Sequence, residues 1–92
     1  MSALSHEALA QALLTVPEWE VKNGELRRTF NFTDFRESMS FVNLVAALAE
    51  RAGHHPDIDI RYNKVLLSLV THDEGGISEK DFALARDITG VL

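Results

Sequence analysis

The feature that most constrains the fold is a strict alternation of apolar and polar residues at positions 57–62, followed at once by an apolar run. A period of two is typical of a strand with one buried face. The apolar run, residues 65–70, indicates a second strand. Asn63 and Lys64 lie between the two runs and predict a two-residue turn, because asparagine tolerates a positive φ angle. The two runs therefore predict an antiparallel hairpin whose apolar side chains share one face.

Three of the four histidines flank this hairpin. With the turn at residues 63–64, the register carried outward sets His55 opposite His72 and His54 opposite Asp73. Directly opposed residues on paired strands have Cβ atoms roughly 4.5–5.5 Å apart. Neighbouring residues of an extended chain point to opposite sides, so the two adjacent histidines both face inward only if the main chain bends. A glycine before them and a proline after them can supply that bend.

A cluster of histidines has a definite chemical use. The imidazole group has an unperturbed pKa of about 6.5, so it gives and takes protons near neutral pH. A dehydration needs an acid that protonates the departing hydroxyl and a base that accepts a proton from the neighbouring atom. The chain has no cysteine and shows no serine on a strained elbow, which leaves no poised nucleophile. An acid–base pocket is the interpretation that we favour.

Other interpretations remain open on the residues alone. Three histidines together with Asp73 or Glu50 are enough ligands for zinc, although adjacent histidines lack the spacing of the helical HExxH motif. Histidines at a helix–strand junction can also serve only to satisfy main-chain groups. Asp81 has two compatible roles: it completes a helix cap with Ser78, and it orients a histidine or the substrate.

The same stretch carries the spacing of a known family. Its fixed points are Glu50-x3-His54-His55-Pro56-x5-Tyr62-x9-His72-x8-Asp81. This pattern resembles the signature of the pterin-4a-carbinolamine dehydratases in both spacing and residue types. One departure is Ile58, because animal members often carry an aromatic residue there. We expect altered packing at that position and intact chemistry.

The resemblance implies an enzyme that dehydrates 4a-hydroxytetrahydropterins to quinonoid dihydropterins, and so recycles the cofactor of aromatic amino-acid hydroxylases. It also implies that no metal and no organic cofactor takes part. The catalytic positions would be His54, His55 and His72. Glu50 and Asp81 would support these histidines without contacting the substrate. The residues expected to contact the pterin are His54, His55, Pro56, Thr71, His72, Asp73 and Glu74.

The remaining segments predict three helices and a second hairpin. Residues 4–14 form an amphipathic helix, a long helix begins at a cap on Asp34 and ends at Gly53, and a last helix begins at Ser78. Between the first two helices, residues 19–32 predict a hairpin around an Asn-Gly turn. The order α-β-β-α-β-β-α predicts an α+β fold, with a four-stranded antiparallel sheet and three helices on one of its faces.

Length and composition narrow the class of protein. Residues 1–92 are enough for a single domain that folds without disulfides or metals. The formal net charge of −5 argues against a nucleic-acid-binding surface, which needs clustered lysine and arginine. No apolar run is long enough to span a bilayer, and the N-terminus lacks the pattern of a signal peptide. With no cysteine, the chain suits a reducing cytoplasm, where we expect it to act.

The second strand of the histidine-flanked hairpin predicts self-association. In the hairpin register one set of its side chains faces the helices, whereas Leu66 and Val70 face the other way. Three helices cover only one face of such a sheet, so the second apolar face requires another cover. We expect a homodimer or homotetramer built on residues 64–72, by face contact or, if the strand lies at the sheet edge, by strand pairing across a two-fold axis. The dehydratase family also assembles as dimers or tetramers.

A protein of another class fits the same residues. Animal relatives of the dehydratases also act as dimerisation cofactors for a homeodomain transcription factor, and some dehydratase-like proteins serve as assembly factors. The alternative hypothesis is therefore a non-enzymatic interaction protein on the same fold. The complete set of His54, His55 and His72 favours the enzyme.

Overall fold

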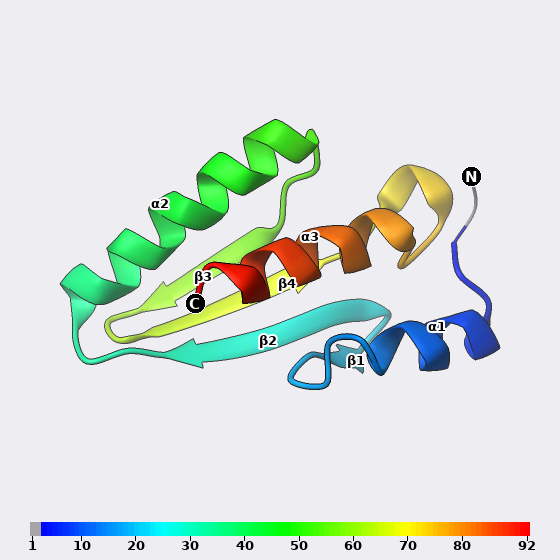
Figure 1. The fold of residues 1–92 in the computed structure, drawn as a ribbon, viewed down its shortest axis with the longest axis horizontal. Coiled ribbons are helices and arrows are strands. Elements are labelled where there is room, and N and C mark those ends of the chain that lie inside the picture. The colour runs from blue at the N-terminus through cyan, green and yellow to red at the C-terminus, as the bar shows by residue number, and fades with distance from the viewer. Residues whose placement is uncertain (1–2) are drawn as a thin grey trace.

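The computed structural model describes residues 3–92 and has the predicted order of elements (Figure 1). The three helices are α1 His6–Leu13, α2 Phe35–Ala52 and α3 Glu79–Gly90. The four strands are β1 Glu20–Lys22, β2 Glu25–Asn31, β3 Asp57–Arg61 and β4 Lys64–Leu69, and a short 3-10 helix follows at His72–Glu74. The prediction of an α+β fold with a four-stranded antiparallel sheet is confirmed. No helix within residues 3–92 is long and apolar enough to cross a membrane.

The helices begin at the capping residues that the sequence indicates. The Ser5 hydroxyl accepts a hydrogen bond from the Ala8 N–H at 3.1 Å, and α1 is shorter at both ends than predicted. Asp34 Oδ1 accepts from the Glu37 N–H at 2.9 Å, and the Glu37 carboxylate accepts in return from the Thr33 N–H at 3.0 Å. An N-cap of this kind typically contributes about 1 kcal/mol to stability.

β4 lies inside the sheet. The strand order is β1-β2-β4-β3, and every neighbouring pair is antiparallel. The edge strands are therefore β1 and β3, while β4 hydrogen-bonds to β2 on one side and to β3 on the other (Figure 1). The β1–β2 hairpin has the predicted turn, because Asn23 and Gly24 take φ angles of 54° and 76°, as a type I′ turn requires.

The turn between β3 and β4 differs from the prediction. It consists of Tyr62 and Asn63, so Arg61 pairs with Lys64, and each β3 residue pairs with a β4 residue two positions earlier than predicted. Tyr62 takes the positive φ angle, 54°, and its side chain is exposed. Asn63 is held from outside the hairpin: its side-chain N–H donates to the Phe32 carbonyl at 3.1 Å, and its own carbonyl accepts from the Phe32 N–H at 2.8 Å. Because the side-chain period of a strand is two, this shift of two residues leaves the side chains of β3 and β4 on their predicted faces.

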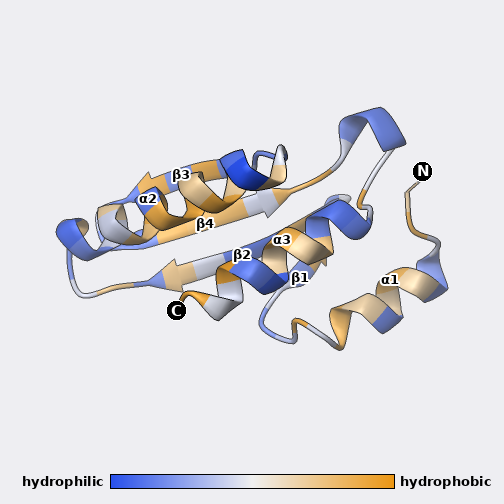
Figure 2. Ribbon diagram, turned by 45° about the horizontal axis from the view of Figure 1, so that its top comes forward, coloured by the Kyte–Doolittle hydropathy of each residue, from blue (hydrophilic) through white to orange (hydrophobic). Residues whose placement is uncertain are grey.

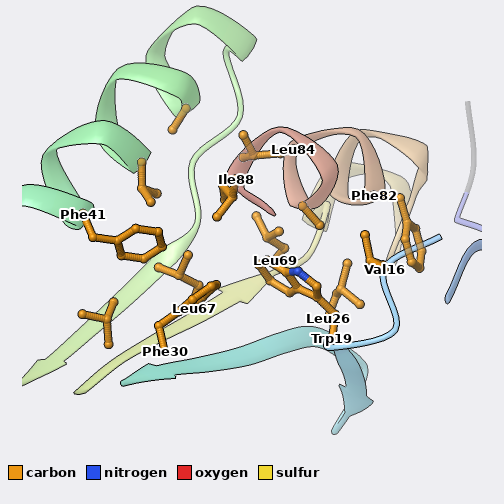
Figure 3. Packing of buried hydrophobic residues seen from close by; sticks show 14 of the residues in the cluster. Val16, Trp19, Leu26, Phe30, Phe41, Leu67, Leu69, Phe82, Leu84 and Ile88 are labelled. Carbon is orange, nitrogen blue, oxygen red and sulfur yellow. The ribbon is translucent and has the colours of Figure 1, made fainter. Parts of the chain in front are cut away.

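One face of the sheet carries the hydrophobic core. The three inward-facing apolar residues of β4 are fully buried, and α2 and α3 pack over them (Figure 3). Trp19 is part of this core: its ring meets Phe30 edge to face at 5.9 Å between centroids, and its indole N–H donates to the Thr89 hydroxyl at 3.3 Å. Figure 2 shows that β4 is apolar along most of its length, whereas the segment between β4 and α3 is hydrophilic.

The strand order corrects the prediction about self-association. β4 has no free edge, because β2 and β3 use both rows of its main-chain groups, so edge pairing through β4 is wrong. Leu66 alternates with the fully buried Val65 and Leu67 and so faces outward, and Leu66 and Val70 are both half-buried. Ser68 lies between them and donates to the Glu25 carboxylate at 2.5 Å. Self-association through this outer face stays a prediction.

A lysine on the outer face tests that prediction. Leu66→Lys puts an ammonium group where a second chain would have to bury it, so we expect the sedimentation coefficient to fall toward that of a monomer. Leu14→Lys, at a side chain that is 74% exposed, is the control and should leave the assembly unchanged. Wild-type protein that sediments as a monomer at micromolar concentration would contradict the prediction.

Candidate active site

The end of α2 sets the direction of the two adjacent histidines. Gly53 is left-handed, with φ at 64°, and its N–H donates to the Glu50 carbonyl at 3.2 Å. The His54 N–H donates to the Ala49 carbonyl at 3.2 Å. These two bonds form a Schellman motif, which ends the helix and turns the chain. Glycine adopts this φ without the steric cost that a side chain adds, so the predicted bend before the histidines is present.

His54 is tied to the start of α3. Its ring Nε2 lies 2.5 Å from Oδ1 of Asp81, and the pair is almost closed off from solvent, with 13% of the His54 side chain and none of the Asp81 side chain exposed. The other carboxylate oxygen, Oδ2, accepts from the Ser78 N–H and from the Thr71 hydroxyl, each at 2.9 Å. Asp81 thus completes the helix cap and contacts a histidine, the two roles that its sequence position allowed.

His55 makes a more exposed pair. Its Nε2 lies 2.5 Å from Oε2 of Glu50, and most of both side chains is in solvent. Exposed ion pairs contribute about 0–1 kcal/mol, so this contact orients the ring more than it stabilises the fold. Glu50 lies in the last turn of α2, where the helix dipole disfavours a carboxylate. The contact with His55 accounts for a carboxylate at this unfavourable position.

The position of His72 relative to the hairpin differs from the prediction. The observed register does not set His55 opposite His72, because the hairpin turn begins one residue earlier than expected. His72 instead opens the 3-10 helix after β4, and its side chain is exposed. The residue before it, Thr71, donates to Asp81, which contacts His54. Asp81, at the start of α3, thus joins His54 to the residue that precedes His72, and the meeting of all three histidines stays a prediction.

Three contacts fix the turn that carries the third histidine. The main chains of Thr71 and Gly76 exchange two hydrogen bonds, of 3.1 and 3.2 Å. The Glu74 carboxylate, only 9% of whose side chain is exposed, lies 3.2 Å from the Lys80 ammonium in the first turn of α3. The Glu74 carbonyl accepts from the Ala3 N–H at 3.0 Å, so the N-terminal segment lies against the turn (Figure 1).

The other predicted site residues lie around these pairs. Pro56 is half-buried directly before β3, and Asp73 is exposed in the 3-10 helix. Thr71 is buried, and its hydroxyl lies 2.7 Å from the hydroxyl of Ser78. Sequence reasoning missed this contact and the ion pair of Glu74, because no local pattern marks contacts between the end of a strand and the helix that follows it.

The histidines do not belong to a group of metal-holding side chains in the part of the chain that the structure describes. Among residues 3–92, no three His, Cys, Asp or Glu side chains are grouped so that they can hold one ion. Two surface hollows, of about 220 and 280 Å³, lie on the outer face of the sheet and between α1 and β1, and neither is lined by His54, His55 or His72. The expectation that the chemistry is metal-free stays a prediction.

Comparison with known proteins identifies the family of this chain. Residues 2–91 match the family described as pterin 4 alpha carbinolamine dehydratase. A Chloroflexus aurantiacus protein provisionally named pterin-4-alpha-carbinolamine dehydratase is 52% identical over 92 residues, covering 100% of this chain and 99% of that protein. An Acidobacterium capsulatum protein with the same provisional name is 51% identical and covers 100% of both chains. The chain therefore belongs to the pterin-4a-carbinolamine dehydratase family, and the resemblance seen in its sequence is confirmed.

Solved structures share the fold. A Brucella melitensis protein described as a transcriptional coactivator/pterin dehydratase superposes with a TM-score of 0.93 at 30% identity, covering 98% of each chain. A pterin dehydratase-like protein identified as a RuBisCO assembly factor of the alpha-carboxysome superposes with a TM-score of 0.64 at 26% identity, covering 79% of this chain and 84% of that one. The fold is thus shared by proteins whose descriptions name different activities.

Removing the carboxylate of Asp81 should destabilise the protein. Asp81→Ala takes away the acceptor shared by His54, Thr71 and the Ser78 N–H. Buried donors left without a partner cost about 1–3 kcal/mol each, so we expect the free energy of unfolding in urea to fall by at least about 2 kcal/mol. Asp73→Ala, at an exposed position, should change it by less than about 0.5 kcal/mol. Equal losses in the two variants would contradict the role given to Asp81.

Proposed function

We propose that this chain removes water from a 4a-hydroxytetrahydropterin by histidine acid–base catalysis. The observation that carries the proposal is the buried contact of His54 with Asp81, beside the turn of His72 and the pair of His55 with Glu50, in a chain of the carbinolamine dehydratase family. The proposed catalytic residues are His54, His55 and His72. The product would be recycled to the tetrahydropterin that aromatic amino-acid hydroxylases use, in the cytoplasm.

The reaction needs two proton transfers and no electron transfer. The bond from C4a to its hydroxyl oxygen breaks, the proton on N5 is lost, and a double bond forms between C4a and N5. One water leaves, and the quinonoid dihydropterin remains. An imidazolium donates the proton to the departing hydroxyl, and a neutral imidazole accepts the proton from N5. We propose no metal and no organic cofactor, because histidine can perform both transfers.

The carboxylate partners support this chemistry by holding the rings. Asp81 holds His54 from inside the protein, and Glu50 holds His55 at the surface. The flat pterin would lie along residues 54–56 and 71–74, where main-chain groups can pair with its donor–acceptor edge. These two segments are the ends of α2 and β4, both of which the hydrophobic core fixes.

Protein binding without catalysis is the second candidate. It is favoured by the two solved relatives, one described as a transcriptional coactivator and the other as an assembly factor. A chain of that kind has no need for paired histidines, whereas His54 and His55 each contact a carboxylate here. The second candidate is preferred if the purified protein leaves the rate of carbinolamine decay unchanged.

Removal of the histidines should slow the reaction. We expect His54→Ala and His72→Ala each to lower the rate of 4a-carbinolamine decay by roughly 10²- to 10⁴-fold, because each takes away a positioned acid or base. His6→Ala is the matched control, since His6 lies in the first turn of α1 and should leave the rate unchanged. A His54→Ala, His72→Ala double variant that keeps wild-type turnover in a stopped-flow assay would exclude the assignment.

Chelation should leave the activity intact. We expect the wild-type rate to survive exhaustive dialysis against a chelator, because proton transfer between imidazoles and the pterin uses no Lewis acid. Metal content is measured on the same sample. Stoichiometric zinc in the purified protein, with activity lost on its removal and restored on its return, would contradict the proposal.

A further inference from the structure

The hydrogen bonds around Asp81 have a definite direction. An ionised carboxylate only accepts hydrogen bonds, and the N-terminus of a helix such as α3 favours a negative charge. The Thr71 hydroxyl has a single proton, which it donates to Asp81 Oδ2 at 2.9 Å. The 2.7 Å contact between the Thr71 and Ser78 hydroxyls must then be donated by Ser78. The Ser78 oxygen accepts in turn from the Lys80 N–H at 3.3 Å, so the chain of bonds runs one way toward the carboxylate.

This direction decides which ring nitrogen of His54 carries the proton. Oδ2 of Asp81 already accepts from the Ser78 N–H and from the Thr71 hydroxyl. Oδ1 faces Nε2 of His54 at 2.5 Å and, as an acceptor, requires a proton on that nitrogen. The ring atom left to exchange a proton with a substrate is therefore Nδ1.

Thr71 has no polar group left over for a ligand. Its N–H donates to the Gly76 carbonyl, and its carbonyl accepts from the N–H groups of Glu74 and Gly76. Its hydroxyl bridges Ser78 and Asp81, and the residue is 3% exposed. A side chain used in this way acts on the site through its neighbours rather than by touching the substrate.

We infer that Thr71 and Ser78 are positioning residues that hold Asp81 so that His54 keeps its Nε2-protonated tautomer and presents Nδ1 to the substrate. The inference rests on the proposed dehydration for its consequence in catalysis, whereas the tautomer itself is a property of the free protein. The family resemblance implies that Thr71 contacts the substrate, and this inference assigns Thr71 a positioning role instead. It also names the nitrogen of His54 that takes part in proton transfer.

Two substitutions at one position separate a positioning role from substrate contact. Thr71→Val keeps the shape of the side chain and removes the hydroxyl, whereas Thr71→Ser keeps the hydroxyl. Thr29→Val makes the same change at an exposed position of β2 and is the control. The ring nitrogens of His54 are observed by ¹⁵N NMR and assigned by their loss in His54→Ala. kcat and KM for carbinolamine decay are measured on the same proteins.

We expect wild-type protein and Thr29→Val to show neutral His54 protonated on Nε2. Thr71→Val should show Nδ1-protonated or mixed rings and a kcat lower by roughly 10- to 100-fold, the scale of one hydrogen bond to a charged group, with KM changed by less than about twofold. Thr71→Ser should restore both the ring signals and kcat. Wild-type His54 protonated on Nδ1, or Thr71→Val with wild-type ring signals, would overturn the inference, and so would a raised KM at unchanged kcat.

The test separates this inference from the proposed function. If the wild type does not accelerate carbinolamine decay, the proposed function fails, while the ring signals of wild type and Thr71→Val still decide the tautomer. If Thr71→Val does not fold, as judged by circular dichroism, Ser78→Ala takes its place because it removes the donor to Thr71. Ser78→Ala should move the His54 ring signals in the same direction, and unchanged signals would overturn the inference.

Discussion

The buried carboxylate of Asp81 is the interaction on which the site depends. A charge removed from water is costly unless donors surround it, and here Ser78, Thr71 and His54 fill both of its oxygens. These three groups belong to the start of α3, the end of β4 and the turn after α2. The carboxylate can therefore be buried only where the three segments meet, and the same meeting places His54 beside the residue that precedes His72.

The hydrophobic core holds these three segments in fixed positions relative to one another. β4 is covered on one face by α2 and α3, so its end has little freedom to move away from the start of α3 (Figure 3). Phe82 and Ala85 of α3 are fully buried close to Asp81 in the chain, which fixes the depth of the helix. The polar site thus forms at the end of the same elements whose middle parts form the core. A stable apolar interior and the polar contacts around Asp81 arise from one packing arrangement.

Local patterns predicted much of the fold. The capping residues Ser5, Asp34 and Ser78, the Asn23-Gly24 turn and the inward faces of the strands all follow from short-range chemistry, and all are confirmed. The β3–β4 turn was missed because a contact from outside the hairpin, with Phe32, holds Asn63 and leaves the positive φ to Tyr62. The strand order could not be predicted from periodicity, because each strand pattern is satisfied at an edge or in the middle. Edge pairing of β4 was wrong for that reason.

The residues of the candidate site stay a prediction, and the contacts that the structure shows among them differ from the predicted ones. Each family position from Glu50 to Asp81 is in the sequence, but the register does not set His55 opposite His72, and the contact that is present joins Thr71, the residue before His72, to Asp81. That link joins the end of one element to the start of the next, and neither a period nor a cap pattern encodes it. The contact of Asp81 with His54 was open to sequence reasoning only because the helix cap placed Asp81 at the start of α3.

The most direct test of a histidine acid–base site organised by this carboxylate is the decay of a 4a-carbinolamine followed with and without the wild-type protein. The carbinolamine is generated in the observation cell, and its loss is recorded over a series of protein concentrations in one buffer. We expect the decay rate to rise in proportion to the protein added and to saturate with substrate. Decay at the rate of buffer alone, with protein that is folded by circular dichroism, would contradict the dehydratase assignment.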